Sequence, residues 1–117
     1  MDAGAGTGGA ALCLAARVND IQITGVEIQP GYAALARQSA ALNGWSQNVS
    51  FLDGDLSELP TTAAFREFDH VMTNPPYMAA GSGRVSPDEG KATAHAESHV
   101  GLSEWLSICI RATRSRG

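Results

Sequence analysis

The tetrapeptide at positions 74–77, Asn-Pro-Pro-Tyr, combines residue types that could activate a weakly nucleophilic amino group. The side-chain oxygen of Asn74 and the backbone carbonyl of Pro75 could each accept an N–H bond, and Pro76 would fix the direction of that carbonyl. Two fixed acceptors would aim the nitrogen lone pair at an electrophilic carbon and stabilise the charge that develops during transfer. Tyr77 could stack on a planar substrate, so the motif predicts chemistry at an exocyclic or amide nitrogen.

A second candidate site lies at the N-terminus, where Asp2 is followed by glycines at positions 4, 6, 8 and 9. Glycine lets the backbone turn tightly and approach a ligand. Gly4, Gly6 and Gly9 match the fingerprint of proteins that bind a nicotinamide dinucleotide. Asp2 with the glycines at 4, 6 and 8 equally matches a loop that holds S-adenosylmethionine. The glycines alone do not decide between these two cofactors.

Two acidic side chains are predicted to complete the cofactor site. Glu27 ends an apparent strand, where its carboxylate could accept hydrogen bonds from both hydroxyls of a ribose. Asp55 ends the next strand and could accept from the exocyclic amine of an adenine, beside the backbone N–H of Leu56. Asp53 is the nearby alternative, but Asp-Gly is a common turn sequence, so the prediction favours Asp55.

The elements that must position these residues follow from the pattern of apolar side chains. The predicted strands are 21–28, 48–52 and 68–73, and the predicted helices are 10–16, 30–43 and 102–112, with a short helical turn at 62–67. Strands that alternate with helices at this spacing predict an α/β fold with a parallel sheet. All the candidate residues would then lie at the carboxyl edge of that sheet, where ligands bind.

Helical spacing also predicts which side chains are buried. The core face of the 30–43 helix is predicted to consist of Tyr32, Leu35, Ala36, Ser39 and Leu42. In the last helix the apolar residues recur at helical spacing, which predicts an amphipathic helix; they are Leu102, Trp105, Leu106, Cys109 and Ala112. Cys13 and Cys109 lie in apolar stretches far apart in sequence, which predicts two buried free thiols. Residues 78–93 are rich in Gly, Ser and Pro and are predicted to form a mobile substrate loop.

Composition limits the class of protein. The chain has 117 residues, of which 44% are hydrophobic, as expected for one globular domain with a modest core. Its net charge of −4 argues against a surface that binds polyanions over the whole chain. There is no signal region and no apolar run long enough to cross a bilayer, so a cytoplasmic protein without membrane association is predicted.

Taken together, these motifs resemble those of class I S-adenosylmethionine-dependent methyltransferases, over almost all of the chain. The resemblance rests on Asp-Ala-Gly-Ala-Gly-Thr-Gly at 2–8, on Glu27, on Gly54-Asp55 and on Asn-Pro-Pro-Tyr, the signature of the amino-methylating members. Residues 74–97 are moreover similar to the bacterial adenine-N6 methyltransferases that modify valine tRNA.

This resemblance implies a Rossmann-like fold that binds S-adenosyl-L-methionine and transfers its methyl group in line to an exocyclic nitrogen, most readily adenine N6 in tRNA. The implied cofactor-binding residues are Asp2, Gly4, Gly6, Gly8, Glu27, Ile28, Asp55, Leu56 and Asn74. The implied catalytic residues are Asn74, Pro75, Pro76 and Tyr77. No metal is implied: His95 and His99 have helical spacing, but no third ligand is evident.

Several alternatives stay open. The same tetrapeptide serves enzymes that methylate glutamine N5 in proteins and some DNA adenine enzymes. A nicotinamide-dependent dehydrogenase would explain the glycines and Glu27 but leaves Asn-Pro-Pro-Tyr without a role. In the resembled fold the first strand begins before Asp2, and three more strands follow the last helix. Residues 1–117 are therefore expected to form a partial domain that self-associates or binds the cofactor weakly, with little turnover.

Overall fold

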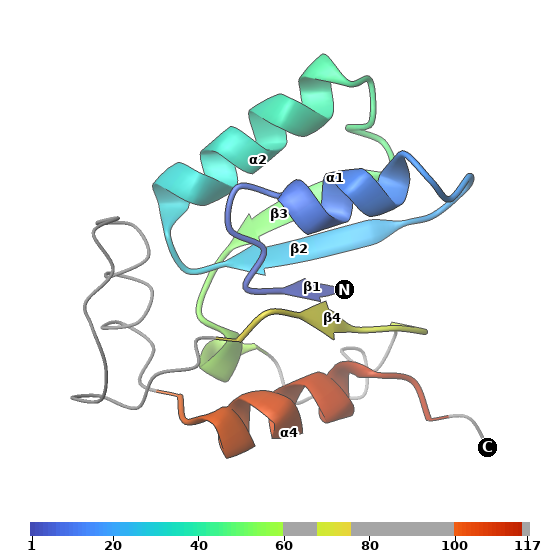
Figure 1. The fold of residues 1–117 in the computed structure, drawn as a ribbon. Coiled ribbons are helices and arrows are strands. Elements are labelled where there is room, and N and C mark those ends of the chain that lie inside the picture. Colours follow the sequence, from blue (N-terminus) through green and yellow to red (C-terminus); the bar gives the residue numbers. More distant parts are fainter. Residues whose placement is uncertain (60–67, 76–99, 116–117) are drawn as a thin grey trace.

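The computed structural model describes residues 1–59, 68–75 and 100–115 (Figure 1). Predicted features at 62–67, at 76–99 and at Pro76, Tyr77, His95 and His99 lie outside these residues. The described elements are β1 (Asp2–Ala3), α1 (Gly9–Ala15), β2 (Ile23–Glu27), α2 (Pro30–Leu42), β3 (Val49–Asp53), the 3₁₀ helix η1 (Leu56–Glu58), β4 (Met72–Thr73) and α4 (Leu102–Ala112).

The four strands form one parallel sheet in the order β3-β2-β1-β4. This confirms the predicted α/β fold of the Rossmann-like type. The short strand β1 occupies the slot between β2 and β4, with Ala3 in register with Val26 on one side and with Thr73 on the other. The ends of β1, β2 and β4 therefore meet at one edge of the sheet.

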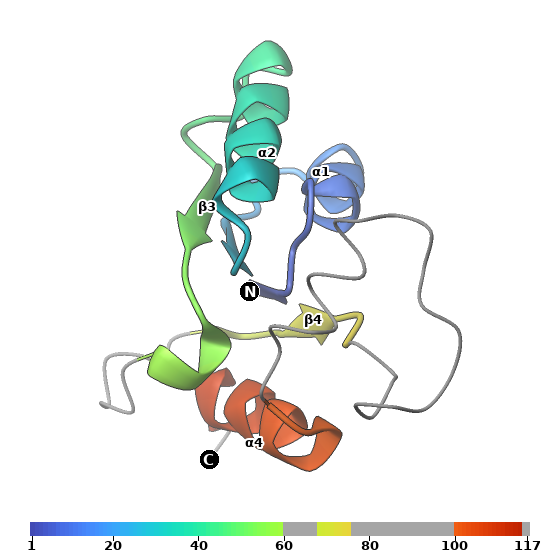
Figure 2. The ribbon, with the colours of Figure 1, turned by 90° about the vertical axis from the view of Figure 1, so that its left-hand side faces the viewer.

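Helices cover both faces of the sheet, as Figures 1 and 2 show, with α1 and α2 on one face and α4 on the other. Each face has its own apolar core. The core under α4 contains Met1, Ala3, Val26, Leu56, Trp105, Ile108, Cys109 and Ala112. The core under α1 and α2 contains Ala5, Ala11, Ile23, Ala36, Ala40, Val49 and Phe51. A three-layer α/β arrangement results.

The prediction of which side chains of α2 are buried is largely wrong. Ala33, Ala36 and Ala40 are the buried residues of this helix, whereas Leu35 is 49% exposed and Leu42 is 88% exposed. The helix presents its smallest side chains to the sheet, so its backbone can lie close to the strands. The helical spacing of the larger apolar residues gave the wrong face because a helix that lies close to a sheet has room for alanine but not for leucine side chains.

Two further predictions need correction. Cys13 is exposed on α1, although Cys109 is buried as predicted, and both thiols are free. The predicted last helix forms as α4, which buries Trp105, Ile108, Cys109 and Ala112 and leaves Leu102 and Leu106 exposed. The predicted strand at 68–73 pairs with the sheet only at its last two residues, and Phe68 instead forms an isolated bridge to Thr113.

The ring of Phe51 on β3 packs against the glycine loop. A Cβ added to Gly25 on β2 would overlap Phe51 and would lie 2.9 Å from the Cβ of Ala5. A Cβ added to Gly8 would lie 2.8 Å from Cζ of the same ring, and Gly8 has a φ of 86°. The Phe51 ring thus fills the space that two absent side chains leave open.

Candidate functional site

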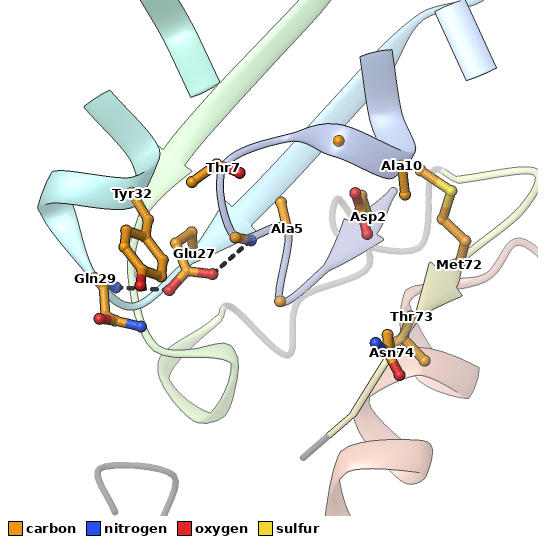
Figure 3. Close-up of a pocket in the computed structure, with 13 residues that line it drawn as sticks. Asp2, Ala5, Thr7, Ala10, Glu27, Gln29, Tyr32, Met72, Thr73 and Asn74 are labelled. Atoms are coloured by element: carbon orange, nitrogen blue, oxygen red, sulfur yellow. Dashed lines mark hydrogen bonds between the residues drawn. The ribbon is translucent and has the colours of Figure 1, made fainter. Parts of the chain in front are cut away.

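A cavity of about 510 Å³ opens at the carboxyl ends of β1, β2 and β4 (Figure 3). Open α/β sheets bind their ligands at this edge. The cavity is lined by Asp2, Gly4, Ala5, Gly6, Thr7, Gly9, Ala10, Glu27, Gln29, Tyr32, Met72, Thr73 and Asn74. It therefore brings together the glycine loop, the acidic end of β2 and the beginning of the Asn-Pro-Pro-Tyr motif.

The glycine loop turns sharply over the end of β2. Gly4 and Gly6 have φ values of 75° and 57°, which L side chains rarely adopt. The backbone N–H groups of Gly4 and Ala5 both donate to the Val26 carbonyl, at 2.9 Å. A Cβ added to Gly6 would meet no atom within 4 Å, so at this position backbone conformation, not space, calls for glycine.

Glu27 ties this loop to the sheet. The residue is only 5% exposed. Its Oε2 accepts from the Gly6 N–H at 2.7 Å, and its Oε1 accepts from the Gln29 N–H at 2.9 Å. Each carboxylate oxygen can accept more than one hydrogen bond, so capacity for a ligand hydroxyl is left. Glu27 thus fixes the loop from inside the cavity, a role that the sequence pattern did not reveal.

Asp2 lines the same cavity and has a buried carboxylate oxygen. The residue is 4% exposed, and among the described residues its Oδ2 has no hydrogen-bond partner. Burial raises the pKa of the Asp2 carboxyl above its usual value, and the nearby charge of Glu27 adds to this, against the N-terminal ammonium and the Ala11 backbone N–H. A buried, unpaired carboxylate oxygen is costly unless a ligand donates to it.

Replacing Asp2 with asparagine is expected to stabilise the unliganded protein near neutral pH. Because the folded-state pKa is raised above 3.8, folding stability falls as pH rises from that value through the folded pKa. Removing the charge should lift the melting temperature by about 3–6 °C, which corresponds to roughly 1 kcal/mol at this size. The gain should vanish toward about pH 4, where the wild-type carboxyl is also protonated.

Thermal unfolding followed by circular dichroism between about pH 4 and 8 tests this expectation. Asp20→Asn is the matched control, since Asp20 is exposed and asparagine tolerates its positive φ. An Asp2→Asn variant whose melting temperature stays at or below that of the wild type at neutral pH would contradict the assigned cost of this charge.

Asn74 lies on the opposite side of the cavity from Glu27, directly after β4 (Figure 3). Its side chain is exposed, whereas the neighbouring Pro75 is half-buried and does not line the cavity. The hydroxyl of Thr73 donates to the Ala3 carbonyl at 2.8 Å and so holds the end of β4 against β1. The structure therefore places Asn74 across from the glycine loop.

Four predicted cofactor residues do not line the cavity. Gly8 packs on Phe51, Ile28 is half-buried, and Leu56 is buried in the core beneath α4. The Oδ1 atom of Asp55 accepts from the Ser57 N–H at 2.8 Å and caps η1. Their roles toward a cofactor stay predictions.

Asp53, the alternative to Asp55, pairs with Arg37 of α2 at 2.8 Å. This ion pair joins α2 to the end of β3 and is about half exposed on both sides. Asp53 and Asp55 thus each have a partner within the chain, and the preference for Asp55 stays a prediction.

Sequence reasoning missed several residues of the cavity wall. These are Ala5, Thr7, Ala10, Gln29, Tyr32, Met72 and Thr73. Tyr32 was predicted to lie in the core, but it lies beside Glu27 and Gln29 at the mouth of the cavity (Figure 3). Its place in the first turn of the helix after Glu27 was the available signal.

Two further structural properties concern the described part of the chain. Within residues 1–59, 68–75 and 100–115, no group of three or more His, Cys, Asp or Glu side chains is placed to hold a metal ion. Among the same residues, no helix is long and apolar enough to cross a membrane.

The sequence matches one protein family over most of its length. Residues 1–87 match the model of the methyltransferase domain. The chain is 31% identical over 109 residues to a tRNA1(Val) (adenine(37)-N6)-methyltransferase of Shewanella amazonensis; the match covers 93% of this chain and 44% of that protein. The chain therefore spans less than half the length of this relative.

Solved structures give the same picture. An RNA methyltransferase from Salinibacter ruber, in complex with S-adenosyl-L-homocysteine, is 33% identical with a TM-score of 0.51, covering 62% of this chain and 44% of the other. A methyltransferase from Geobacter sulfurreducens, also in complex with S-adenosyl-L-homocysteine, has a TM-score of 0.61 over 99% of this chain and 37% of the other. At 23% identity the second likeness concerns the fold alone.

Proposed function

Because this chain belongs to the methyltransferase-domain family, we propose that its cavity binds S-adenosyl-L-methionine and that Asn74 presents an amino nitrogen to the methyl group. The observation that carries this proposal is the shared cavity, which has the glycine loop and Glu27 on one side and Asn74 on the other. A cofactor held by the first wall would direct its reactive end toward the second.

The cavity residues fit the chemical groups of this cofactor. The carboxylate of Glu27 can accept from ribose hydroxyls, since each of its oxygens is engaged by only one backbone N–H in the structure. The unpaired Oδ2 of Asp2 can accept from the α-ammonium of the methionine portion. The glycine loop leaves open space at Gly6, where a side chain would project. Asp55, Leu56 and Ile28 are proposed to contact the adenine from beyond the cavity.

The bound cofactor would supply a methyl group on a positively charged sulfur, the electrophile of the reaction. The side-chain oxygen of Asn74 and the backbone carbonyl of Pro75 would each accept a hydrogen bond from the substrate amine. These two bonds would orient the nitrogen lone pair toward the methyl carbon. The substrate amine would gain the methyl group in place of one proton, which would pass to solvent, and sulfur would keep the electron pair of its former bond to that carbon. Pro76 and Tyr77 are proposed to fix the motif and to stack on the substrate base.

Adenine N6 in tRNA is the proposed substrate, since the relative from Shewanella amazonensis has this named activity. A cytoplasmic location is proposed with this substrate, since tRNA would have to be accessible to the enzyme. Methylation of a glutamine N5 or of DNA adenine uses an equally conjugated nitrogen and is an outcome of the test below. Self-association of the chain stays a prediction, in line with the exposed Leu102, Leu106 and Ile110 on α4.

The deciding experiment measures methyl transfer from radiolabelled S-adenosylmethionine to separated tRNA, DNA and protein fractions. The 117-residue chain is assayed alone and, where its gene encodes a longer protein, also as that longer protein. Label in the tRNA fraction, mapped to an adenine, is the expected result; label only in DNA or protein would refute the tRNA assignment. Calorimetric titration with S-adenosylhomocysteine and with NADH separates a methyltransferase from a dehydrogenase, since tight binding of NADH alone would refute the proposed cofactor.

A further inference from the structure

A chain of two hydrogen bonds links α4 to the wall of the cavity through Thr73. The indole Nε1 of Trp105 donates to the Thr73 hydroxyl at 2.9 Å, and that hydroxyl donates to the Ala3 carbonyl at 2.8 Å. An indole N–H can only donate, so the Thr73 oxygen must accept from it and must direct its own proton to Ala3. The direction of both bonds is therefore fixed.

The same indole also lies against the glycine loop. Trp105 is 8% exposed, and a Cβ added to Gly4 would lie 3.1 Å from Cζ2 and 3.2 Å from Cη2 of its ring. Trp105 thus contacts a residue from each of two cavity walls. Gly4 belongs to the glycine loop, and Thr73 immediately precedes Asn74. No other described hydrogen bond joins α4 to β4.

We propose that Trp105 is a positioning residue for Asn74, holding the end of β4 at a fixed distance from the glycine loop through Thr73. This inference rests on the proposed function, because it assigns Asn74 to the methyl-transfer step. Trp105 itself lines no part of the cavity and does not touch the reacting atoms. Its effect would be on alignment, and misplacement by about 1 Å can lower a rate up to 100-fold.

Conservative variants separate the two contacts. Trp105→Phe keeps an aromatic ring near Gly4 but removes the N–H donor, whereas Thr73→Val keeps the shape of the side chain and removes the hydroxyl. We expect each to lower kcat about tenfold while the Kd for S-adenosylhomocysteine changes less than about threefold. Because both substitutions break the same chain of hydrogen bonds, the kcat of the double variant should be about equal to that of the more affected single variant.

Two variants serve as comparisons. Thr73→Ser keeps the hydroxyl and should restore most of the kcat lost in Thr73→Val. Trp45→Phe removes the other tryptophan, which lies away from the cavity in the α1–α2 core, and should leave kcat unchanged. All assays are run well below the melting temperature of each variant, so a purely structural contribution would lower that temperature without changing kcat.

A readout that does not need turnover checks the geometry. Hydrogen exchange of the Trp105 indole N–H, followed by NMR, should be faster in Thr73→Val than in wild type or Thr73→Ser. Unchanged exchange would overturn the link. If the wild type methylates its substrate but Trp105→Phe and Thr73→Val retain full kcat, the positioning role alone is refuted. If the wild type methylates none of the tRNA, DNA and protein fractions in either form assayed above, the proposed function is refuted, and this inference falls with it.

Discussion

Replacing Asn74 with alanine in a catalytically competent form of the protein is expected to lower kcat about 100-fold or more, with nearly unchanged affinity for S-adenosylhomocysteine. Asn74 is exposed at the wall of the cavity that faces the glycine loop, so its loss removes an oriented acceptor without disturbing the apolar core. Its interaction would strengthen as positive charge develops on the substrate nitrogen, which is why kcat should fall while cofactor affinity does not.

Single-turnover kinetics with labelled cofactor and calorimetry on the same preparation measure both quantities. Asn19→Ala is the matched control, since Asn19 is an exposed residue outside the cavity. An Asn74→Ala variant that turns over at the wild-type rate would remove Asn74 from the mechanism. A variant that loses cofactor affinity instead would assign Asn74 to cofactor binding.

Replacing Glu27 with alanine is expected to weaken cofactor binding by about 1–3 kcal/mol, or roughly 5- to 150-fold in Kd. Two effects act together. The ribose hydroxyls would lose their acceptor, and the backbone N–H groups of Gly6 and Gln29 would lose the carboxylate that orders the loop. The second effect should also lower the melting temperature of the unliganded protein.

Glu27→Gln helps to separate these effects, because its single amide oxygen can replace only one of the two loop contacts. Calorimetry with S-adenosylhomocysteine gives the affinity and thermal unfolding gives the stability of each variant. Glu104→Ala provides the control, since Glu104 is an exposed residue of α4. If Glu27→Ala binds S-adenosylhomocysteine with wild-type affinity, Glu27 does not belong to the cofactor site.

Much of the fold could be predicted because the parallel sheet leaves a strong local pattern. The strand that ends at Glu27, the helix that begins at Pro30 and the helix over Leu102–Ala112 were each located to within two residues. Some of the candidate residues meet at one edge of the sheet, because parallel strands place their ends there. Asp2, Gly4, Gly6, Glu27 and Asn74 accordingly share one cavity.

The errors arise where tertiary contacts decide. The exposure of Leu42 and Cys13 depends on how closely each helix approaches the sheet, which helical spacing does not encode. The unpaired oxygen of Asp2 and the two loop contacts of Glu27 depend on loop geometry set by positive φ values. The link from Trp105 to Thr73 joins residues 32 positions apart and has no local signature at all.

The packing of Phe51 against Gly8 and Gly25 has a consequence for how this sequence can vary. A side chain at either glycine would need the volume that the ring now fills, so neither glycine can change while Phe51 stays. A smaller residue at position 51 would in turn leave a void near Ala5, and the glycine loop would lose the packing of the Phe51 ring. Positions 8, 25 and 51 are therefore sterically coupled, and among related sequences we expect them to be retained or exchanged together. Because Gly8 has a positive φ, which disfavours other residues, covariation should be most frequent between positions 25 and 51.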